Sequence, residues 1–137
     1  MELSLAKDIR LKDEHAAAVT RVTAALKEQG FGVLTSIDIR AAFKEKIGAD
    51  FRPYTILGAC NPPLAHRALS TEPLVGLMLP CNVTVEAAPG GGSIVRFINP
   101  DAMLGVGALG AHPALGEVAN DAKVRLERVA AALRSAG

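Results

Sequence analysis

Gly76-Leu-Met-Leu-Pro-Cys-Asn-Val-Thr-Val-Glu86 is the clearest strand in this chain, because its apolar residues recur at every second position. The residues that share one face of it are Leu77, Leu79, Cys81, Val83 and Val85. This alternation predicts a strand over residues 76–86 with one buried face. Pro80 has no amide hydrogen to donate to a neighbouring strand, which indicates an edge strand or a bulge at that position.

The residues that follow complete a β-hairpin. Pro89-Gly-Gly-Gly92 supplies the turn, and Ser93–Ile98 supplies the second strand. Upstream, weak or clear alternation and short apolar runs predict three more strands, over residues 2–9 (with Leu3 and Leu5 on one face), 31–38 and 54–60. The chain therefore predicts a sheet of about five strands that is mainly antiparallel.

Two long helices complete the predicted architecture. The first begins at an Asp13 cap, carries Val19, Val22 and Leu26 on one stripe, and ends at Gly30. The last begins at Pro113, and its apolar stripe comprises Leu115, Val118, Ala122, Leu126, Val129 and Leu133. Shorter helices are expected after the caps Asp38 and Asn61. We predict an α+β fold in which each long helix covers a sheet face, within one domain spanning residues 1–137.

Composition and charge limit the classes of partner. The chain has 137 residues, of which 50% are hydrophobic, and its 15 Lys and Arg nearly cancel its 14 Asp and Glu. A net charge of +1 with dispersed basic residues argues against a nucleic-acid partner. The sequence shows no apolar run typical of a signal peptide, and residues 102–116 are too short and irregular for a membrane span. We expect a cytoplasmic protein without a membrane partner.

Several stretches together resemble one known family. They are Gly32-Val-Leu-Thr-Ser-Ile-Asp38, Tyr54-Thr-Ile-Leu-Gly-Ala-Cys-Asn-Pro-Pro-Leu-Ala-His-Arg-Ala-Leu69, Glu72-Pro73 and Gly76-Leu-Met-Leu-Pro-Cys-Asn-Val83. Over about residues 30–103 the chain resembles the domain-of-unknown-function family 302. The resemblance implies a curved antiparallel sheet similar to the TATA-binding-protein-like class, and often a homodimer. It implies no activity.

The two Cys-Asn pairs are the sharpest candidates for a site. Cys60-Asn61 and Cys81-Asn82 each lie in or at the end of a predicted strand. If those strands are neighbours, the thiols of Cys60 and Cys81 approach each other, and with His66 they would suit Cu(I) or Zn²⁺. Burial as two structural thiols is the alternative interpretation, since free cysteine is among the most buried residue types. Asn61 also has a structural role as a helix cap.

Other candidates carry weaker signals. His66 lies on the short helix after Cys60, where a solvent-exposed position is the simpler interpretation. Arg52 and Tyr54 precede a buried strand, so they suit either an anion site or, for Arg52, a surface salt bridge. The glycines between Gly105 and Gly110 match a dinucleotide fingerprint but do not directly follow a strand, which leaves a flexible cover over a pocket or close packing.

Three functions remain open from the sequence. The first is a homodimeric binding or sensing module that holds a small molecule or a metal ion near Tyr54, Cys60, Asn61, His66, Cys81 and Asn82. The second is a thiol-dependent redox enzyme that uses Cys60 or Cys81. The third is an interaction protein with no site. The sequence names no cofactor and no catalytic residue, and it leaves the question of enzymatic activity undecided.

Overall fold

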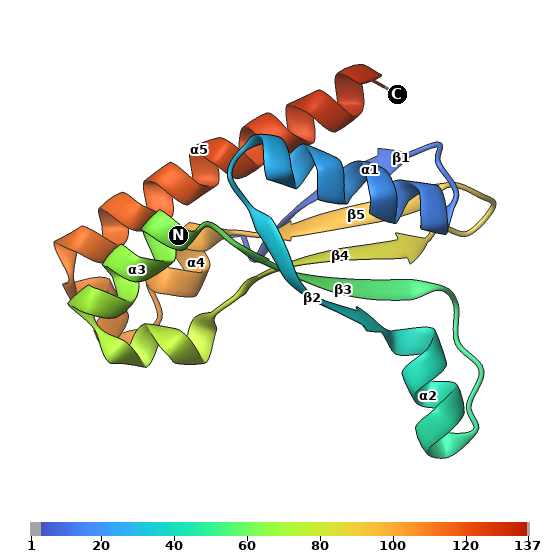
Figure 1. The fold of residues 1–137 in the computed structure, drawn as a ribbon, viewed down its shortest axis with the longest axis horizontal. Coiled ribbons are helices and arrows are strands. Elements are labelled where there is room, and N and C mark those ends of the chain that lie inside the picture. Colours follow the sequence, from blue (N-terminus) through green and yellow to red (C-terminus); the bar gives the residue numbers. More distant parts are fainter. Residues whose placement is uncertain (1–3, 137) are drawn as a thin grey trace.

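One sheet of five antiparallel strands, in the order β1-β5-β4-β3-β2, organises the molecule (Figure 1). This computed structural model describes residues 4–136. The strands are Ala6–Leu11 (β1), Gly32–Asp38 (β2), Tyr54–Cys60 (β3), Cys81–Ala87 (β4) and Ser93–Ile98 (β5). The prediction of an α+β fold with a mainly antiparallel five-stranded sheet is confirmed.

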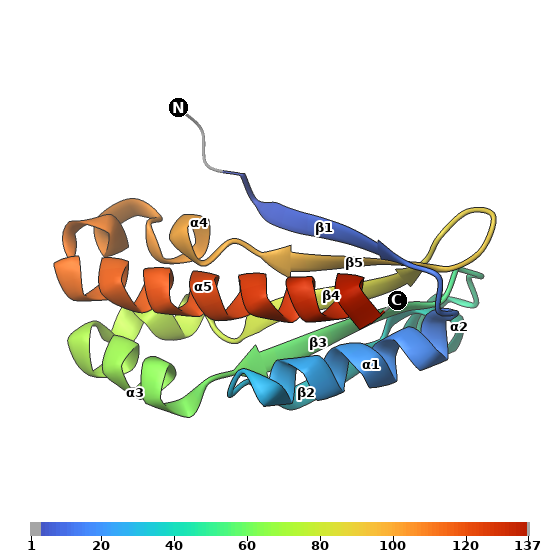
Figure 2. The same cartoon turned by 90° about the horizontal axis from the view of Figure 1, so that it is seen from above.

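Helices surround this sheet unevenly. They are His15–Glu28 (α1), Ile39–Ile47 (α2), Pro62–Thr71 (α3), Pro100–Leu104 (α4) and Pro113–Ala136 (α5), with 3-10 helices at Pro73–Met78 (η1) and Gly107–Ala111 (η2). The two long helices, α1 and α5, lie side by side on the same face of the sheet (Figure 2). We call the opposite face, which neither long helix covers, the open face. Each long helix therefore covers a sheet face, as expected, but both cover the same face.

The core lies between the two long helices and the covered face. All six residues of the predicted α5 stripe are buried, as are Val22 and Leu26 of α1. The α1 residues and the stripe from Ala122 onward pack against Val83, Val95 and Phe97 of β4 and β5. Leu115 and Val118 belong to a second cluster, which contains Cys81 and Met103. Burial of a fully enclosed Val, Leu or Phe side chain contributes about 1.5–3 kcal/mol, so this layer holds α1 and α5 on the sheet.

The predicted strand over residues 76–86 is shorter than its alternation suggests. Pro73 stands at the start of a 3-10 helix, and the Glu72 carboxylate caps that helix by accepting a 2.9 Å hydrogen bond from the Leu74 amide. The strand therefore begins only at Cys81. This strand, β4, is the central strand of the sheet and not an edge strand. Pro80 lies just before it, so the missing amide hydrogen of Pro80 costs the strand no hydrogen bond.

The first strand and helix are also displaced from their predicted bounds. β1 runs over Ala6–Leu11, and it buries Ile9 and Leu11 while Leu5 stays exposed; Leu3 lies outside the described residues. Glu14 rather than Asp13 is the N-cap of α1. Asp13 instead accepts a 2.5 Å hydrogen bond from Arg21, which lies in the second turn of the helix.

The glycine-rich segment is packed rather than loose. A Cβ at Gly105 would lie 2.7 Å from the Asp101 carbonyl oxygen, and one at Gly110 would lie 3.0 Å from the Gly105 carbonyl oxygen. Gly105 thus fits against the last turn of α4, and Gly110 lets η2 approach the residue that ends α4. Leu109 of η2 is buried. Of the two interpretations, close packing is the one that this geometry favours.

Candidate functional site

The structure distributes the six predicted site residues over different surfaces. β3 and β4 are neighbours, as the metal hypothesis required, and their register pairs Ala59 with Cys81. Side chains alternate along a strand, so Cys60 points to the opposite sheet face from Ala59 and Cys81. Cys81 packs under the helices, whereas Cys60 lies on the open face. The two thiols therefore belong to adjacent strands but do not share a face.

The remaining candidates follow the same division. Tyr54 pairs with Glu86, and Asn82 pairs with Gly58, which places both Tyr54 and Asn82 on the open face. His66 is exposed on α3. Among residues 4–136 no group of three or more His, Cys, Asp or Glu side chains is arranged to hold a metal ion. Asn61 and Cys81 line the same pocket.

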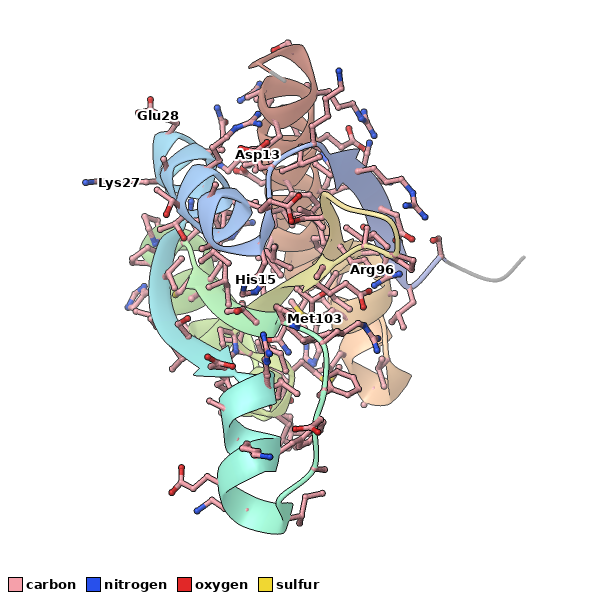
Figure 3. All side chains as sticks on the ribbon, turned by 90° about the vertical axis from the view of Figure 1, so that its right-hand side faces the viewer. Asp13, His15, Lys27, Glu28, Arg96 and Met103 are labelled. Carbon is pink, nitrogen blue, oxygen red and sulfur yellow. The ribbon has the colours of Figure 1, made fainter. Side chains whose placement is uncertain are left out.

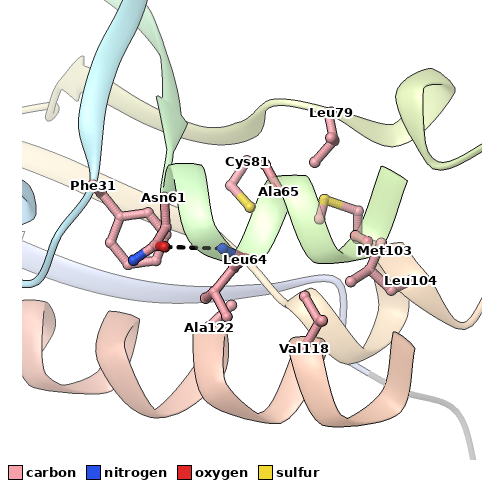
Figure 4. A pocket seen from close by; sticks show the side chains of 11 residues that line it. Phe31, Asn61, Leu64, Ala65, Leu79, Cys81, Met103, Leu104, Val118 and Ala122 are labelled. Carbon is pink, nitrogen blue, oxygen red and sulfur yellow. Dashed lines mark hydrogen bonds between the residues drawn. The ribbon is translucent and has the colours of Figure 1, made fainter. Parts of the chain in front are cut away.

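Asn61 and Cys81 line a small pocket between α3, α4, α5 and the start of β4 (Figure 4). The pocket has a volume of about 30 Å³ and is almost wholly apolar, with Phe31, Leu64 and Val118 among its walls. A cavity needs at least about 10–15 Å³ to admit one water molecule. The pocket therefore has room for a single atom or ion, whereas organic ligands occupy about 300–1,000 Å³.

Local sequence explains how the pocket is built. The Asn61 side chain caps α3, as predicted, by accepting a 3.2 Å hydrogen bond from the Leu64 amide. Pro62 and Pro63 occupy the first turn of α3, where no amide hydrogen is needed. This cap fixes α3 directly after β3 and so sets the distance between its first turn and Cys81.

Met103 is the residue at this pocket that sequence reasoning missed. It lies on α4, is buried, and presents its sulfur to the same pocket as the sulfur of Cys81 (Figure 4). Asn99 caps α4 by accepting a 3.0 Å hydrogen bond from the Asp101 amide. The Asn99-Pro-Asp101 sequence is a typical helix start, and it would have placed Met103 on a helix.

Neither cysteine is prepared for thiolate chemistry. Burial raises the pKa of Cys81 to about 11, and the nearby Cys60 adds to the rise. Burial also raises the pKa of Cys60. Both cysteines are free thiols. A catalytic thiolate at neutral pH requires a lowered pKa, so this arrangement favours binding or packing over nucleophilic catalysis.

A network of paired charges crosses the open face. Glu86, a buried carboxylate on β4, accepts a 2.6 Å hydrogen bond from Arg52 and another hydrogen bond from Arg96. Arg96 also forms a 3.4 Å ion pair with Asp8 of β1. Burial alone would raise the pKa of Glu86, but the two arginines outweigh it and lower that pKa. Arg52 therefore forms the salt bridge that its alternative interpretation predicted.

Aromatic rings support one end of this network. The Arg52 guanidinium lies over the Phe51 ring, 4.4 Å from its centroid, and 5.8 Å from the centroid of Tyr54. Phe51 in turn makes an edge contact with Phe43 of α2, with centroids 5.2 Å apart. Tyr54 thus helps to fix the base of α2 and the position of Arg52. These contacts give Tyr54 a structural role.

Comparisons with known proteins agree with the fold. A family model described as a domain of unknown function, DUF302, matches residues 7–133. The crystal structure of an uncharacterized conserved DUF302 protein from Bacillus stearothermophilus is 32% identical, and the alignment covers 96% of this chain and 98% of that one with a TM-score of 0.80. No curated protein matches the chain. Within residues 4–136, no helix combines the length and apolar character needed to cross a membrane.

Proposed function

Because the chain belongs to the DUF302 family, which is described only as a domain of unknown function, we propose a function from its geometry: a homodimeric binding module that holds one soft metal ion beside Cys81. The observation that carries the metal site is the pocket of about 30 Å³ into which two sulfur atoms are directed. Thiolate and thioether sulfur are the ligands that select Cu(I). Cys81 supplies the first and Met103 the second.

Metal binding at this site involves a proton. Cu(I) replaces the hydrogen of the Cys81 thiol, so that one sulfur–copper bond forms and one proton leaves to solvent. The pKa of about 11 keeps the thiol protonated at neutral pH. Apparent affinity should therefore rise about tenfold for each unit of increasing pH in the neutral range.

An anaerobic titration with Cu(I) against a competing chelator tests the site. We expect the wild-type protein to bind one equivalent and Cys81→Ala to bind none. Met103→Leu keeps the side-chain volume but removes the thioether, and it should weaken binding about tenfold, the equivalent of 1.4 kcal/mol. Cys60→Ala is the matched control, since Cys60 lies on the other face, and it should bind like the wild type.

Two outcomes would contradict the metal site. If Cys60→Ala loses binding, the half-exposed Cys60 thiol is the ligand and the metal does not bind in the Cys81 pocket. If Met103→Leu binds like the wild type and the affinity does not change with pH, then the two sulfur atoms serve packing only. A thiol-dependent enzyme is the weaker candidate, because burial raises the pKa of both thiols.

The homodimer is the second part of the proposal, and the open face supports it. α2 projects from the body on that side of the sheet and buries none of its own residues (Figure 3). A nine-residue helix is too short to be stable alone in water. The charges of Asp8, Glu86, Arg52 and Arg96 are already paired within the chain. A second copy can therefore cover the centre of this face without leaving these four charges unpaired.

Light scattering after size-exclusion chromatography tests the dimer. We expect twice the chain mass of 14.2 kDa at micromolar concentration. Ile47→Glu should yield monomers, because Ile47 is 74% exposed at the end of α2 and would place a charge in the interface. Leu77→Glu is the matched control, since Leu77 is 82% exposed on η1 at the other end of the molecule, and it should remain dimeric.

A monomeric wild-type protein would overturn the dimer and leave the metal site untouched. Dissociation by Leu77→Glu but not by Ile47→Glu would place the interface elsewhere. A cytoplasmic location belongs to the same proposal, and it is supported by the two free cysteines, because reducing compartments keep thiols unpaired.

A further inference from the structure

A second and larger cavity lies between the start of β1, the end of β5 and the middle of α5, away from Cys81. β1 contributes Ala6 and Lys7 to its lining, and α5 contributes Lys123, Leu126 and Glu127. Its volume is about 310 Å³, roughly ten times that of the Cys81 pocket. Organic ligands occupy pockets of about 300–1,000 Å³. This cavity is thus large enough for a small molecule.

The floor of the cavity is apolar and its wall is fixed. Phe97, Pro100 and Leu126 are buried side chains that line it. Asn99 holds the chain at the start of β1, because its side chain donates a 2.7 Å hydrogen bond to the Ser4 carbonyl oxygen and its amide donates a 2.8 Å hydrogen bond to the Leu5 carbonyl oxygen. The cavity is therefore held open by the fold itself.

Charged side chains of both signs surround this apolar floor. Lys7 of β1 and Lys123 and Glu127 of α5 all line the cavity. The Lys123 ammonium also donates a 3.1 Å hydrogen bond to Asp101. Lys7 and Glu127 form no ion pair with any residue between 4 and 136. The charges at the cavity sum to zero, because the ammonium groups of Lys7 and Lys123 balance two carboxylates. These are Glu127 and Asp101.

We propose that this cavity binds a small zwitterion with an apolar side chain, such as a free α-amino acid. The ligand carboxylate is placed at Lys7 and Lys123, its ammonium at Glu127, and its side chain on Phe97 and Leu126. A zwitterion matches a charge sum of zero, whereas a simple acid or amine leaves one carboxylate or ammonium of the protein without a counter-charge. The site is independent of the metal site and of the dimer.

Nuclear magnetic resonance titration with three matched probes tests this class of ligand. The probes are L-phenylalanine, 3-phenylpropionate, which lacks the ammonium, and 2-phenylethylamine, which lacks the carboxylate. We expect L-phenylalanine to shift the side-chain signals of Phe97 and Leu126. The other two probes should bind about tenfold more weakly, because each loses a charge-assisted contact of roughly 1.5 kcal/mol.

Variants of α5 separate the ammonium contact from general effects. Glu127→Gln should weaken L-phenylalanine binding about tenfold and leave 3-phenylpropionate binding unchanged. Glu117→Gln on the same helix is the control, and it should change neither. Equal binding of 3-phenylpropionate and L-phenylalanine to the wild type would contradict the proposal that the ligand is a zwitterion. An absence of shifts at Phe97 and Leu126 with every probe would overturn the site.

Discussion

Gly58→Val should lower the free energy of unfolding by about 3 kcal/mol, at the upper end of the range for overpacking. A Cβ at Gly58 would lie 2.3 Å from the Thr35 hydroxyl oxygen and 2.8 Å from Cγ of Pro80. Thr35 can change rotamer, but the Pro80 ring cannot move without its backbone. β2 and the segment before β4 would both have to shift. Chemical denaturation followed by circular dichroism measures the loss.

The matched control for this prediction lies in the neighbouring strand. Gly32 of β2 has open space where a Cβ would stand. Gly32→Val should be neutral or stabilising, because a β-branched residue suits a strand better than glycine. Equal destabilisation by the two substitutions would mean that the close approach of Thr35 and Pro80 is unimportant.

Glu86→Gln should cost about 2 kcal/mol at neutral pH, because it removes the charge from two hydrogen-bonded ion pairs at a buried carboxylate. Glu117→Gln is the control: its carboxylate also pairs with an arginine, Arg67, but is 66% exposed, against 6% for Glu86. An exposed pair contributes less than about 1 kcal/mol, so this variant should be nearly as stable as the wild type.

The Glu86 contribution depends on pH in a defined direction. Its pKa in the folded protein is lowered from the ordinary value of 4.5. The stabilisation is therefore complete above the ordinary pKa and is lost as the pH falls through the lowered one. The difference in stability between the wild type and Glu86→Gln should shrink below about pH 4.5. A difference that stays constant in acid would mean that shape, and not charge, accounts for the effect.

Sequence patterns correctly predicted those helices and strands that depend on residues close together in the chain. The bounds of β3 and β5, the start of α5, its buried stripe and the caps Asp38 and Asn61 all agree with the structure. Each of these depends on residues within a few turns or one strand. Period-two alternation failed at Leu77, because a proline start and a glutamate cap place it in a 3-10 helix. Leu79 is the C-cap of that helix and precedes the strand.

Long-range neighbours could not be predicted from the chain. The sequence placed Cys60 and Cys81 in strands, but only the register of β3 and β4 sets them on opposite faces. Met103 reaches the Cys81 pocket through a short helix after β5. The pairing of Glu86 with Arg52, 34 residues away, depends on both strand order and the turn before β3.

The pairing of β1 with β5 has a consequence for the order of folding. Ala6 lies opposite Ile98, so the first strand waits for more than ninety residues of chain before its partner exists. Contacts so distant in sequence form slowly, because the loop between them must first be ordered. Hairpin β4–β5 needs only five residues of turn and can form early. During synthesis, Ile9 and Leu11 therefore remain exposed until both β5 and the α5 residues of their cluster emerge, and the nascent chain is most prone to aggregate during that interval.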